Sequence, residues 1–313
     1  MTILWCGGED VDTFYYDGSS TYTYCDESFA RIGSKGGVYY NKFTPITSGW
    51  VSAICCVDTW AGCRLFGLRD SVTGAILGVG QGTSASRLQL FKQGATKVVL
   101  TEETSGVLPS NSVGTANKID IHLVSYGVSG QVLVYVNGNL AIDYSGDLTS
   151  LSASGFDHVA RLKDSGSTIS EIIVADEDTR LMRLKTLAPS AAGDANDWTG
   201  TYEDVDETSI YDSDKIYSAT DNTDFQCNLT GMPSGTWSVK AVKVAVRCVD
   251  SSGSTGIQLG IKSGGTVDVG DTQTASGYWQ TKERLMTVNP VTGVAFTPAE
   301  IEALQINLRA KAL

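Results

Sequence analysis

The chain has 313 residues, which at roughly 100–200 residues per domain suggests two domains. Hydrophobic residues make up 42% and charged residues 19%, so the chain has enough apolar material for packed cores and too little charge for a disordered protein. The formal net charge of −12 opposes binding to phosphate backbones, and we therefore expect no nucleic-acid partner. With only two histidines, a histidine-rich metal site is excluded.

Short strands fill the first part of the chain. The clearest is 118–124, where Ile119, Ile121 and Leu123 alternate with polar residues. Asn137-Gly138 then separates two apolar runs, which is a strong hairpin signal because both residues tolerate positive φ. Further predicted strands lie at 37–40, 51–57, 64–68, 87–91, 97–100, 131–136, 140–144 and 170–175. Closely spaced strands without helical periodicity predict an antiparallel β-sandwich over residues 1–177.

The composition changes after residue 177. Acidic residues dominate 194–224, where Lys215 is the single base, and we interpret 178–224 as an acidic segment that leads into a second domain at 225–313. Strands are predicted there at 237–249, 256–262 and 278–288.

A helix is predicted near the C-terminus. Thr297-Pro298-Ala299-Glu300 supplies a capping hydroxyl, a proline at the first helical position and a glutamate three residues after the cap. The apolar stripe continues through Ile301, Leu304, Ile306 and Leu308. This helix either covers its own domain or docks a partner chain.

The seven cysteines leave three interpretations open. They are small buried hydrophobic residues, or some form disulfides in an oxidising medium, with Cys227 and Cys248 as the preferred pair, or, least favoured, they bind zinc. The N-terminus has no basic segment followed by an apolar core, and no run approaches the ~18 apolar residues of a membrane span. We therefore expect synthesis in the cytoplasm without membrane insertion.

Residues 202–207 form the most acidic run of the chain. Asp204, Asp206 and Glu207 are weak candidates for calcium ligands, because hard cations take several oxygen ligands. The run lacks the spacing of an EF-hand loop, and Val205 interrupts the alternating acids that a glycoside hydrolase would need. A solvated loop or a contact with a basic neighbour is the simpler interpretation.

Two further groups invite a functional interpretation. His158 follows Asp157, but no Gly-x-Ser-x-Gly elbow accompanies them, so a Ser-His-Asp device is disfavoured. Trp60, Tyr22 and Tyr24 are candidates for stacking on sugar rings, with ordinary use in a core as the alternative. We expect no enzyme activity, no catalytic residue and no cofactor.

The hairpin sequence Val134-Tyr135-Val136-Asn137-Gly138 resembles that of laminin-G and concanavalin A-like lectin domains, which are jelly-roll sandwiches. Three further segments, in order, resemble a group of tailed-bacteriophage virion proteins. They are the start Ile3–Asp10, the segment with Trp198, Gly200, Tyr202 and Asp204–Glu207, and the ending with Asn289-Pro290, Thr292-Gly293, Phe296-Thr297 and Glu300-Ile301.

The resemblance implies an all-β fold with an N-terminal concanavalin A-like jelly-roll sandwich and a smaller C-terminal β-sandwich domain ending in a short helix. It also implies an external structural component of a phage virion, in the tail, baseplate, collar or fibre or decorating the head. Such a protein packs against copies of itself and other virion proteins. The alternative is a carbohydrate-binding module for host adsorption, and a polysaccharide-degrading enzyme is less favoured.

Overall fold

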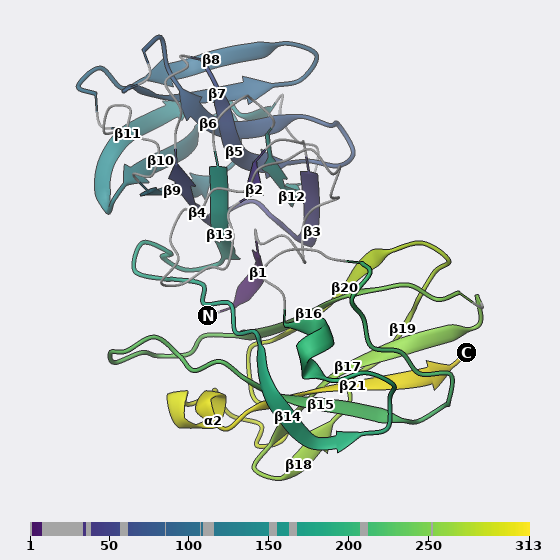
Figure 1. Ribbon diagram of the computed structural model, residues 1–313. Coiled ribbons are helices and arrows are strands. Elements are labelled where there is room, and N and C mark those ends of the chain that lie inside the picture. The colour runs from purple at the N-terminus through teal and green to yellow at the C-terminus, as the bar shows by residue number, and fades with distance from the viewer. Residues whose placement is uncertain are drawn as a thin grey trace. The chain divides into compact units, whose positions relative to one another are not determined.

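The computed structural model describes residues 2–7, 34–35, 39–56, 62–84, 86–106, 108, 116–149, 155–162, 168–206, 212–251 and 253–313. The chain divides into two compact units, one ending at Leu184 and the other running Lys185–Leu313. Both are built from antiparallel strands (Figure 1). The predicted all-β fold class is confirmed.

The first unit is a jelly-roll sandwich of two antiparallel sheets. One sheet contains β1 (Ile3–Gly7), β2 (Ser34–Lys35), β4 (Gly49–Cys56), β9 (Ala116–Ser125), β10 (Gly130–Val136), β11 (Asn139–Gly146) and β13 (Thr168–Ala175). Its strand order is β1-β13-β4-β9-β10-β11, with β2 paired to β13.

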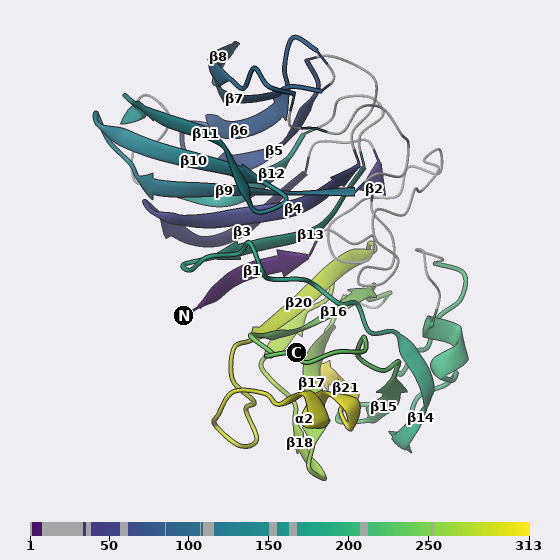
Figure 2. The same cartoon turned by 90° about the vertical axis from the view of Figure 1, so that its left-hand side faces the viewer.

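The opposing sheet contains β3 (Tyr39–Ile46), β5 (Arg64–Arg69), β6 (Ile76–Gln81), β7 (Leu88–Gln93), β8 (Lys97–Glu102) and β12 (Phe156–Arg161). Its strand order is β3-β12-β5-β6-β7-β8. In Figure 2 strands β9, β10 and β11 of the first sheet lie side by side.

Alternating side chains build the core between these sheets. Ile119, Ile121 and Leu123 of β9 are completely buried, as their period-two spacing predicts. They join one cluster with buried leucines and valines from both sheets, among them Leu68 and Val134. Burial of each such side chain contributes about 1.5–3 kcal/mol to folding.

The Asn-Gly hairpin is confirmed. Asn137 has a φ of 50° and Gly138 a φ of 81°, the pair of positive values that a two-residue turn of type I′ requires. Val136 pairs with Asn139 across the turn.

After β13 the chain is fixed to the first unit through residues 176–184, which we call the strap. The Thr179 hydroxyl donates to Asp120 Oδ1 of β9 at 2.7 Å. Arg183 donates Nε and Nη2 to the two carboxylate oxygens of Glu171 in β13, at 2.8 and 2.7 Å. Glu171 is buried and has a φ of 48°, so the strand is locally distorted where it holds the strap.

The second unit has one larger and one smaller sheet. The larger contains β14 (Pro189–Asn196), β15 (Asp224–Leu229), β17 (Thr255–Ser263), β18 (Thr266–Asp268), β19 (Thr272–Thr274) and β21 (Gln305–Ala312), in the order β14-β15-β21-β17-β18 with β19 paired to β17. In the smaller sheet β16 (Val242–Cys248) pairs with β20 (Gln280–Met286). Phe225, Leu259, Ile261 and Val244 are buried in one cluster.

The predicted short helix near the C-terminus is confirmed as α2 (Pro298–Glu302), with both hydrogen bonds of the Thr297–Glu300 capping box. The apolar stripe beyond it was interpreted wrongly, because residues 305–312 form strand β21. That strand lies between β15 and β17 and pairs with both. A full set of hydrogen bonds on two sides outweighs the weak helical periodicity of Ile306 and Leu308.

Asn289, from the ending motif of the sequence, has a structural role in the loop between β20 and α2. Asn289 is fully buried, and its side-chain amide donates to Ser263 Oγ at 2.9 Å and to Glu300 Oε1 at 3.1 Å. Its Oδ1 accepts the Val291 amide. One asparagine thus joins the loop, a strand end and the helix cap.

The acidic segment 178–224 contains more structure than its composition suggests. The strap belongs to the first unit, and β14 already belongs to the sheet of the second. The short 3-10 helix η2 (Tyr202–Val205) follows. An exposed edge strand with small and polar residues carries little of the alternating pattern that identifies a buried strand.

Candidate functional site

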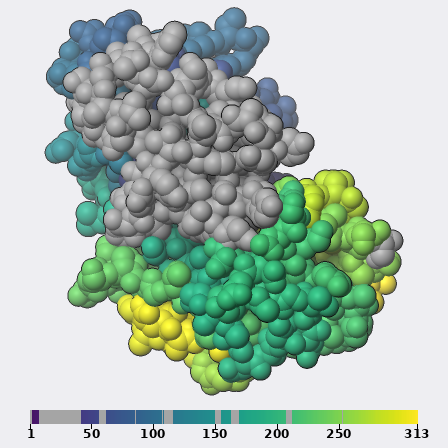
Figure 3. All heavy atoms as spheres, in the orientation of Figure 1, coloured from purple at the N-terminus to yellow at the C-terminus, as the bar shows by residue number. Residues whose placement is uncertain are grey.

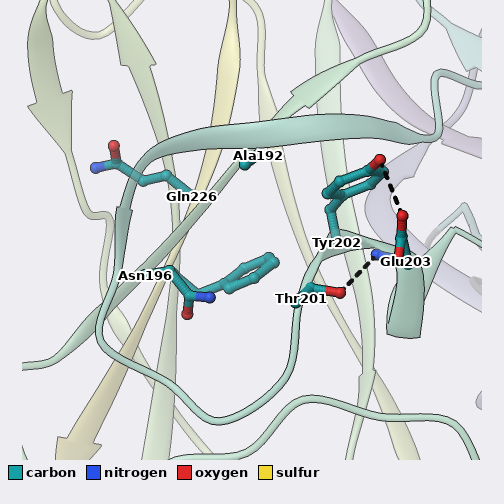
Figure 4. A pocket seen from close by; sticks show the side chains of 7 residues that line it. Ala192, Asn196, Thr201, Tyr202, Glu203 and Gln226 are labelled. Carbon is teal, nitrogen blue, oxygen red and sulfur yellow. Dashed lines mark hydrogen bonds between the residues drawn. The ribbon is translucent and has the colours of Figure 1, made fainter.

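A pocket of about 190 Å³ lies in the second unit between β14, η2 and β15 (Figure 4). Its lining residues are Ala192, Asn196, Thr201, Tyr202, Glu203, Phe225 and Gln226. The β14 segment that borders it is largely exposed, and Figure 3 shows this part of the chain at the surface of the unit.

The pocket opens where β14 separates from β15. Ala192 pairs with Cys227 and Asn196 with Phe225, so the register shifts between these two pairs. Gly193 lies in the shifted segment, where a Cβ would come within 2.6 Å of the Gln226 carbonyl carbon. Glycine therefore permits the close approach of the two strands beside the pocket.

A tight turn brings the chain from β14 to η2. Asn196 Nδ2 donates to the Gly200 carbonyl at 2.9 Å, and Asn196 Oδ1 accepts the Trp198 amide at 3.2 Å. The Trp198 indole donates to the Thr223 carbonyl at 3.0 Å. Gly200 has a φ of +102°, and an added Cβ would lie 2.9 Å from Ile216 Cγ2. Both glycine and tryptophan are thus needed for the turn itself.

The first turn of η2 is fixed by a capping box. Thr201 Oγ1 accepts the Glu203 amide, and Asp204 Oδ2 accepts the Thr201 amide at 2.6 Å. The hydrogen bond from the Thr201 backbone lowers the pKa of Asp204. The cap positions Tyr202 and Glu203 at the pocket (Figure 4).

The pocket combines aromatic rings with a carboxylate. The Tyr202 hydroxyl donates to Glu203 Oε1 at 3.3 Å, and the negative charge of Glu203 raises the pKa of Tyr202. Phe225 is buried behind the opening, with its ring centre 6.3 Å from that of Trp198. No basic residue lines the pocket. This arrangement can bind a small neutral ring that has an apolar face and hydroxyl donors.

Of the predicted calcium candidates, the structure describes Asp204 and Asp206. The Asp204 carboxylate is occupied by the cap, Asp206 is exposed at the end of η2, and Glu207 lies outside the described residues. Where the structure describes the chain, no three metal-ligating side chains form a group that could hold an ion. Calcium binding by Asp204, Asp206 and Glu207 stays a prediction.

The sugar-stacking candidates Trp60, Tyr22 and Tyr24 also lie outside the described residues, so their role stays a prediction. The pocket was missed although Trp198, Gly200 and Tyr202 stood out in the sequence. The acidic composition around them indicated a linker. The pocket forms where one strand separates from its neighbour, and such a separation produces no recognisable pattern of apolar residues in the sequence.

Cys227 and Cys248, the preferred disulfide pair, are both free thiols in the structure. Cys227 is buried in the core of the second unit, and burial raises the pKa of its thiol to about 12. Burial also raises the pKa of Cys248. Both behave as small apolar residues, because thiol exchange requires the thiolate.

Ser71 contacts the Asp157–His158 pair, but the arrangement of the three side chains does not activate the serine hydroxyl. Ser71 donates its amide and its hydroxyl to the Asp157 carboxylate, and His158 Nδ1 lies 2.8 Å from Asp157 Oδ1. In a catalytic triad the histidine stands between acid and serine. Here the acid stands in the middle, so the serine has no base to take its proton.

A second aromatic group lies on β4, β9 and β10. The rings of Trp50 and His122 stack with centres 4.0 Å apart, and the Arg180 guanidinium lies 4.6 Å from the centre of the Tyr135 ring. Burial lowers the pKa of His122. Trp50 is only 7% exposed, so its face is not presented to a ligand. This cluster serves packing under the strap.

No protein-family model matches the chain, and no curated protein matches it either. Among solved structures, a tetrameric galectin from the sponge Cinachyrella sp. is similar at 13% identity and a TM-score of 0.34, covering 44% of this chain and 99% of that one. The alginate lyase Aly36B is similar at 10% identity and a TM-score of 0.36, covering 59% and 100%. A pentraxin from Limulus polyphemus shows 11% identity and a TM-score of 0.33, covering 47% and 77%.

These structural similarities are too low to carry an argument about ligand or activity, and the fold follows from the sheets themselves. Among the helices that the structure describes, none has the length and apolar character to cross a membrane.

Proposed function

We propose that the chain is a non-catalytic carbohydrate-binding protein whose second unit holds one sugar ring in the pocket between β14, η2 and β15. The proposal is carried by one observation: the half-buried ring of Tyr202 lines the pocket together with the carboxylate of Glu203, while the buried Phe225 packs behind them. A sugar ring has an apolar C–H face that packs on an aromatic ring and hydroxyl groups that donate to a carboxylate.

Size and charge restrict the ligand. The pocket, at about 190 Å³, is smaller than the roughly 300–1,000 Å³ of sites for drug-sized molecules. It therefore fits one ring, such as the end or a side branch of a glycan. Glu203 repels an anionic sugar, and no lysine or arginine in the lining compensates for that repulsion. A neutral sugar is favoured.

The absence of catalysis is part of this proposal. Hydrolysis of a glycosidic bond requires two carboxyl groups on either side of the bond, whereas Glu203 is the single acid in the lining. The serine, aspartate and histidine of the first unit are in the wrong order for nucleophilic catalysis.

A glycan array followed by titration calorimetry tests this function. We expect binding of neutral glycans by the wild type and at least about a tenfold weaker affinity for Tyr202→Ala, since loss of one stacking ring costs about 1.4 kcal/mol. Tyr278→Ala is the matched control, because Tyr278 is 71% exposed in the same unit and does not line the pocket.

Two results would contradict the proposal. One is an array without any bound glycan, and the other is equal binding by the wild type and Tyr202→Ala. Shortened products after incubation of the wild type with bacterial polysaccharides would contradict its non-catalytic part.

A second candidate function is packing as a structural subunit of an assembly, and the exposed valines of edge strand β8 favour it. The virion location and virion partners predicted from the resemblance belong to this candidate. Mass spectrometry of purified particles of the encoding phage tests it: we expect the chain among the virion proteins, and its absence there would end the virion proposal.

A further inference from the structure

The hairpin turn between β10 and β11 is fastened to β9 by one asparagine. The pairing of β10 with β9 ends with Val136 opposite Ile119. Asn137 continues it, because its backbone N–H donates to the Lys118 carbonyl at 2.8 Å and the Lys118 N–H donates to Asn137 Oδ1 at 2.9 Å. Two residues of a hydrogen-bonded antiparallel pair normally exchange both bonds through their backbones. Here a side-chain oxygen takes the place of one backbone carbonyl.

The nitrogen of the same side-chain amide is also bound. Asn137 Nδ2 donates to Asn117 Oδ1 at 3.1 Å, and Asn117 is completely buried in β9. Both polar atoms on the Asn137 Cγ carbon are therefore held towards β9. Gly138 follows in the turn and is exposed, and a Cβ added to it would meet nothing within 4 Å. Glycine has no side chain that could hinder an attack by its own amide nitrogen.

An asparagine that precedes glycine can lose its side-chain amide without a catalyst. The Gly138 nitrogen attacks Cγ of Asn137 and forms a new N–C bond, the Cγ–Nδ2 bond breaks, and Nδ2 leaves as ammonia with the proton of the Gly138 nitrogen. Water then opens the resulting cyclic imide at one of its two carbonyl carbons. One opening yields aspartate, and the other yields isoaspartate, whose backbone runs through the side chain and is one methylene longer.

We infer that Asn137 is a deamidation site that the fold holds closed and that reacts when the hairpin leaves β9. The attack brings the Cγ carbon onto the Gly138 nitrogen, and for this the side-chain bonds to Lys118 and Asn117 have to break. The conversion is one-way. A carboxylate at position 137 places negative charge against the Asn117 oxygen, and the longer isoaspartate backbone no longer fits a turn of two residues. A converted hairpin therefore loses its register on β9.

This inference makes the hairpin a chemical record of its own opening. Copies of the chain that open for long enough to react carry an altered residue and stay altered. The site lies in the first unit, and the inference does not depend on the proposed sugar pocket, which lies in the second.

Ageing of the full chain in mildly alkaline buffer, with and without urea, tests the site. Tandem mass spectrometry of tryptic peptides measures the replacement of amide by carboxyl at each asparagine, and chromatography separates aspartate from isoaspartate. We expect Asn137 to react in urea and to react at least about tenfold more slowly in the folded chain, because only the opened fraction is reactive. Asn139 is the internal control, since the branched side chain of Leu140 hinders the same attack.

Two variants test the role of the side-chain bonds. Asn117→Ala removes the partner of Asn137 Nδ2 and should speed the conversion in the folded chain, with circular dichroism showing that the chain stays folded. Asn139→Ala changes an exposed position of the same turn and should leave the rate at Asn137 unchanged. Aged chains that carry isoaspartate should exchange the amide hydrogens of β10 and β11 faster than fresh chains.

Equal rates in urea and in the folded chain would show that the fold does not restrain Asn137 and would overturn the inference. An Asn137 that stays intact in urea would overturn it as well, because the site would lack the reactivity assigned to it. Converted chains that keep slow amide exchange in β10 and β11 would contradict the loss of register on β9.

Discussion

Asp157 illustrates how a single side chain couples stability to pH in the first unit. Burial by itself would raise the pKa of this carboxyl, but hydrogen bonds from Ser71 and His158 outweigh the effect and lower the pKa to about 2 from a usual value of 3.8. A lowered pKa in the folded state means that the charged form stabilises folding. That stabilisation is complete above pH 3.8 and is lost as the pH falls through about 2.

We therefore predict an acid-dependent difference between the wild type and Asp157→Asn. The pH-dependent part of the difference in unfolding free energy should reach about 2 kcal/mol above pH 4 and disappear near pH 2. Urea unfolding at a series of pH values measures it. A difference that stays constant from pH 6 to about pH 2 would show that Asp157 is not stabilised as a carboxylate.

The sequence could indicate residue types but not residue environments. The Asp157–His158 neighbourhood was visible, whereas the bond to Ser71, 86 positions away, was not. Asn289 likewise stood out in a motif, but its burial between a strand end and a helix cap depends on tertiary contacts. Partners distant in the sequence decide what such side chains do, and no local pattern encodes them.

At the scale of elements, the strap is a segment whose acidic composition predicted a linker, although its side chains bind it to the first unit. Its hold on the first unit depends on the Glu171–Arg183 pair, in which Glu171 is 1% exposed, and on the bond from Leu184 N to Glu171 Oε2 at 3.0 Å. Removal of one partner from a buried pair typically costs about 3–5 kcal/mol, because the other charge is left without compensation.

Glu171→Ala should therefore release the strap. We expect faster tryptic cleavage after Arg180, Arg183 and Lys185, read by mass spectrometry of the fragments. Asp178→Ala is the comparison, because it breaks the half-exposed pair with Arg180, and such pairs contribute about 0–1 kcal/mol. Equal cleavage of both variants would show that the Glu171–Arg183 pair does not hold the strap.

Elements with a strong local pattern were predictable. Strand β9 has clean alternation and the hairpin after β10 has Asn-Gly, and both are found where expected. Strand β21 was wrongly assigned to a helix, because its pairing with β15 and β17 depends on tertiary contacts that its own sequence does not reveal. Edge strand β14 was assigned to a linker, because an exposed strand needs no apolar face.

At the scale of the whole molecule, two β-rich units are built around separate hydrophobic cores. The second unit carries the pocket that we propose for a sugar ring. An assembly of several copies, as in the packing candidate, would present several such pockets, so that a glycan-coated surface is bound more than once and the apparent affinity rises without new contacts.

A crystal structure of the full chain soaked with the best-binding neutral sugar from the array tests the proposed function most directly. We predict density for one sugar ring against Tyr202, with a hydroxyl group within hydrogen-bonding distance of Glu203. Sugar density confined to the first unit, or a pocket that stays free of sugar at saturating concentration, would contradict carbohydrate binding at this site.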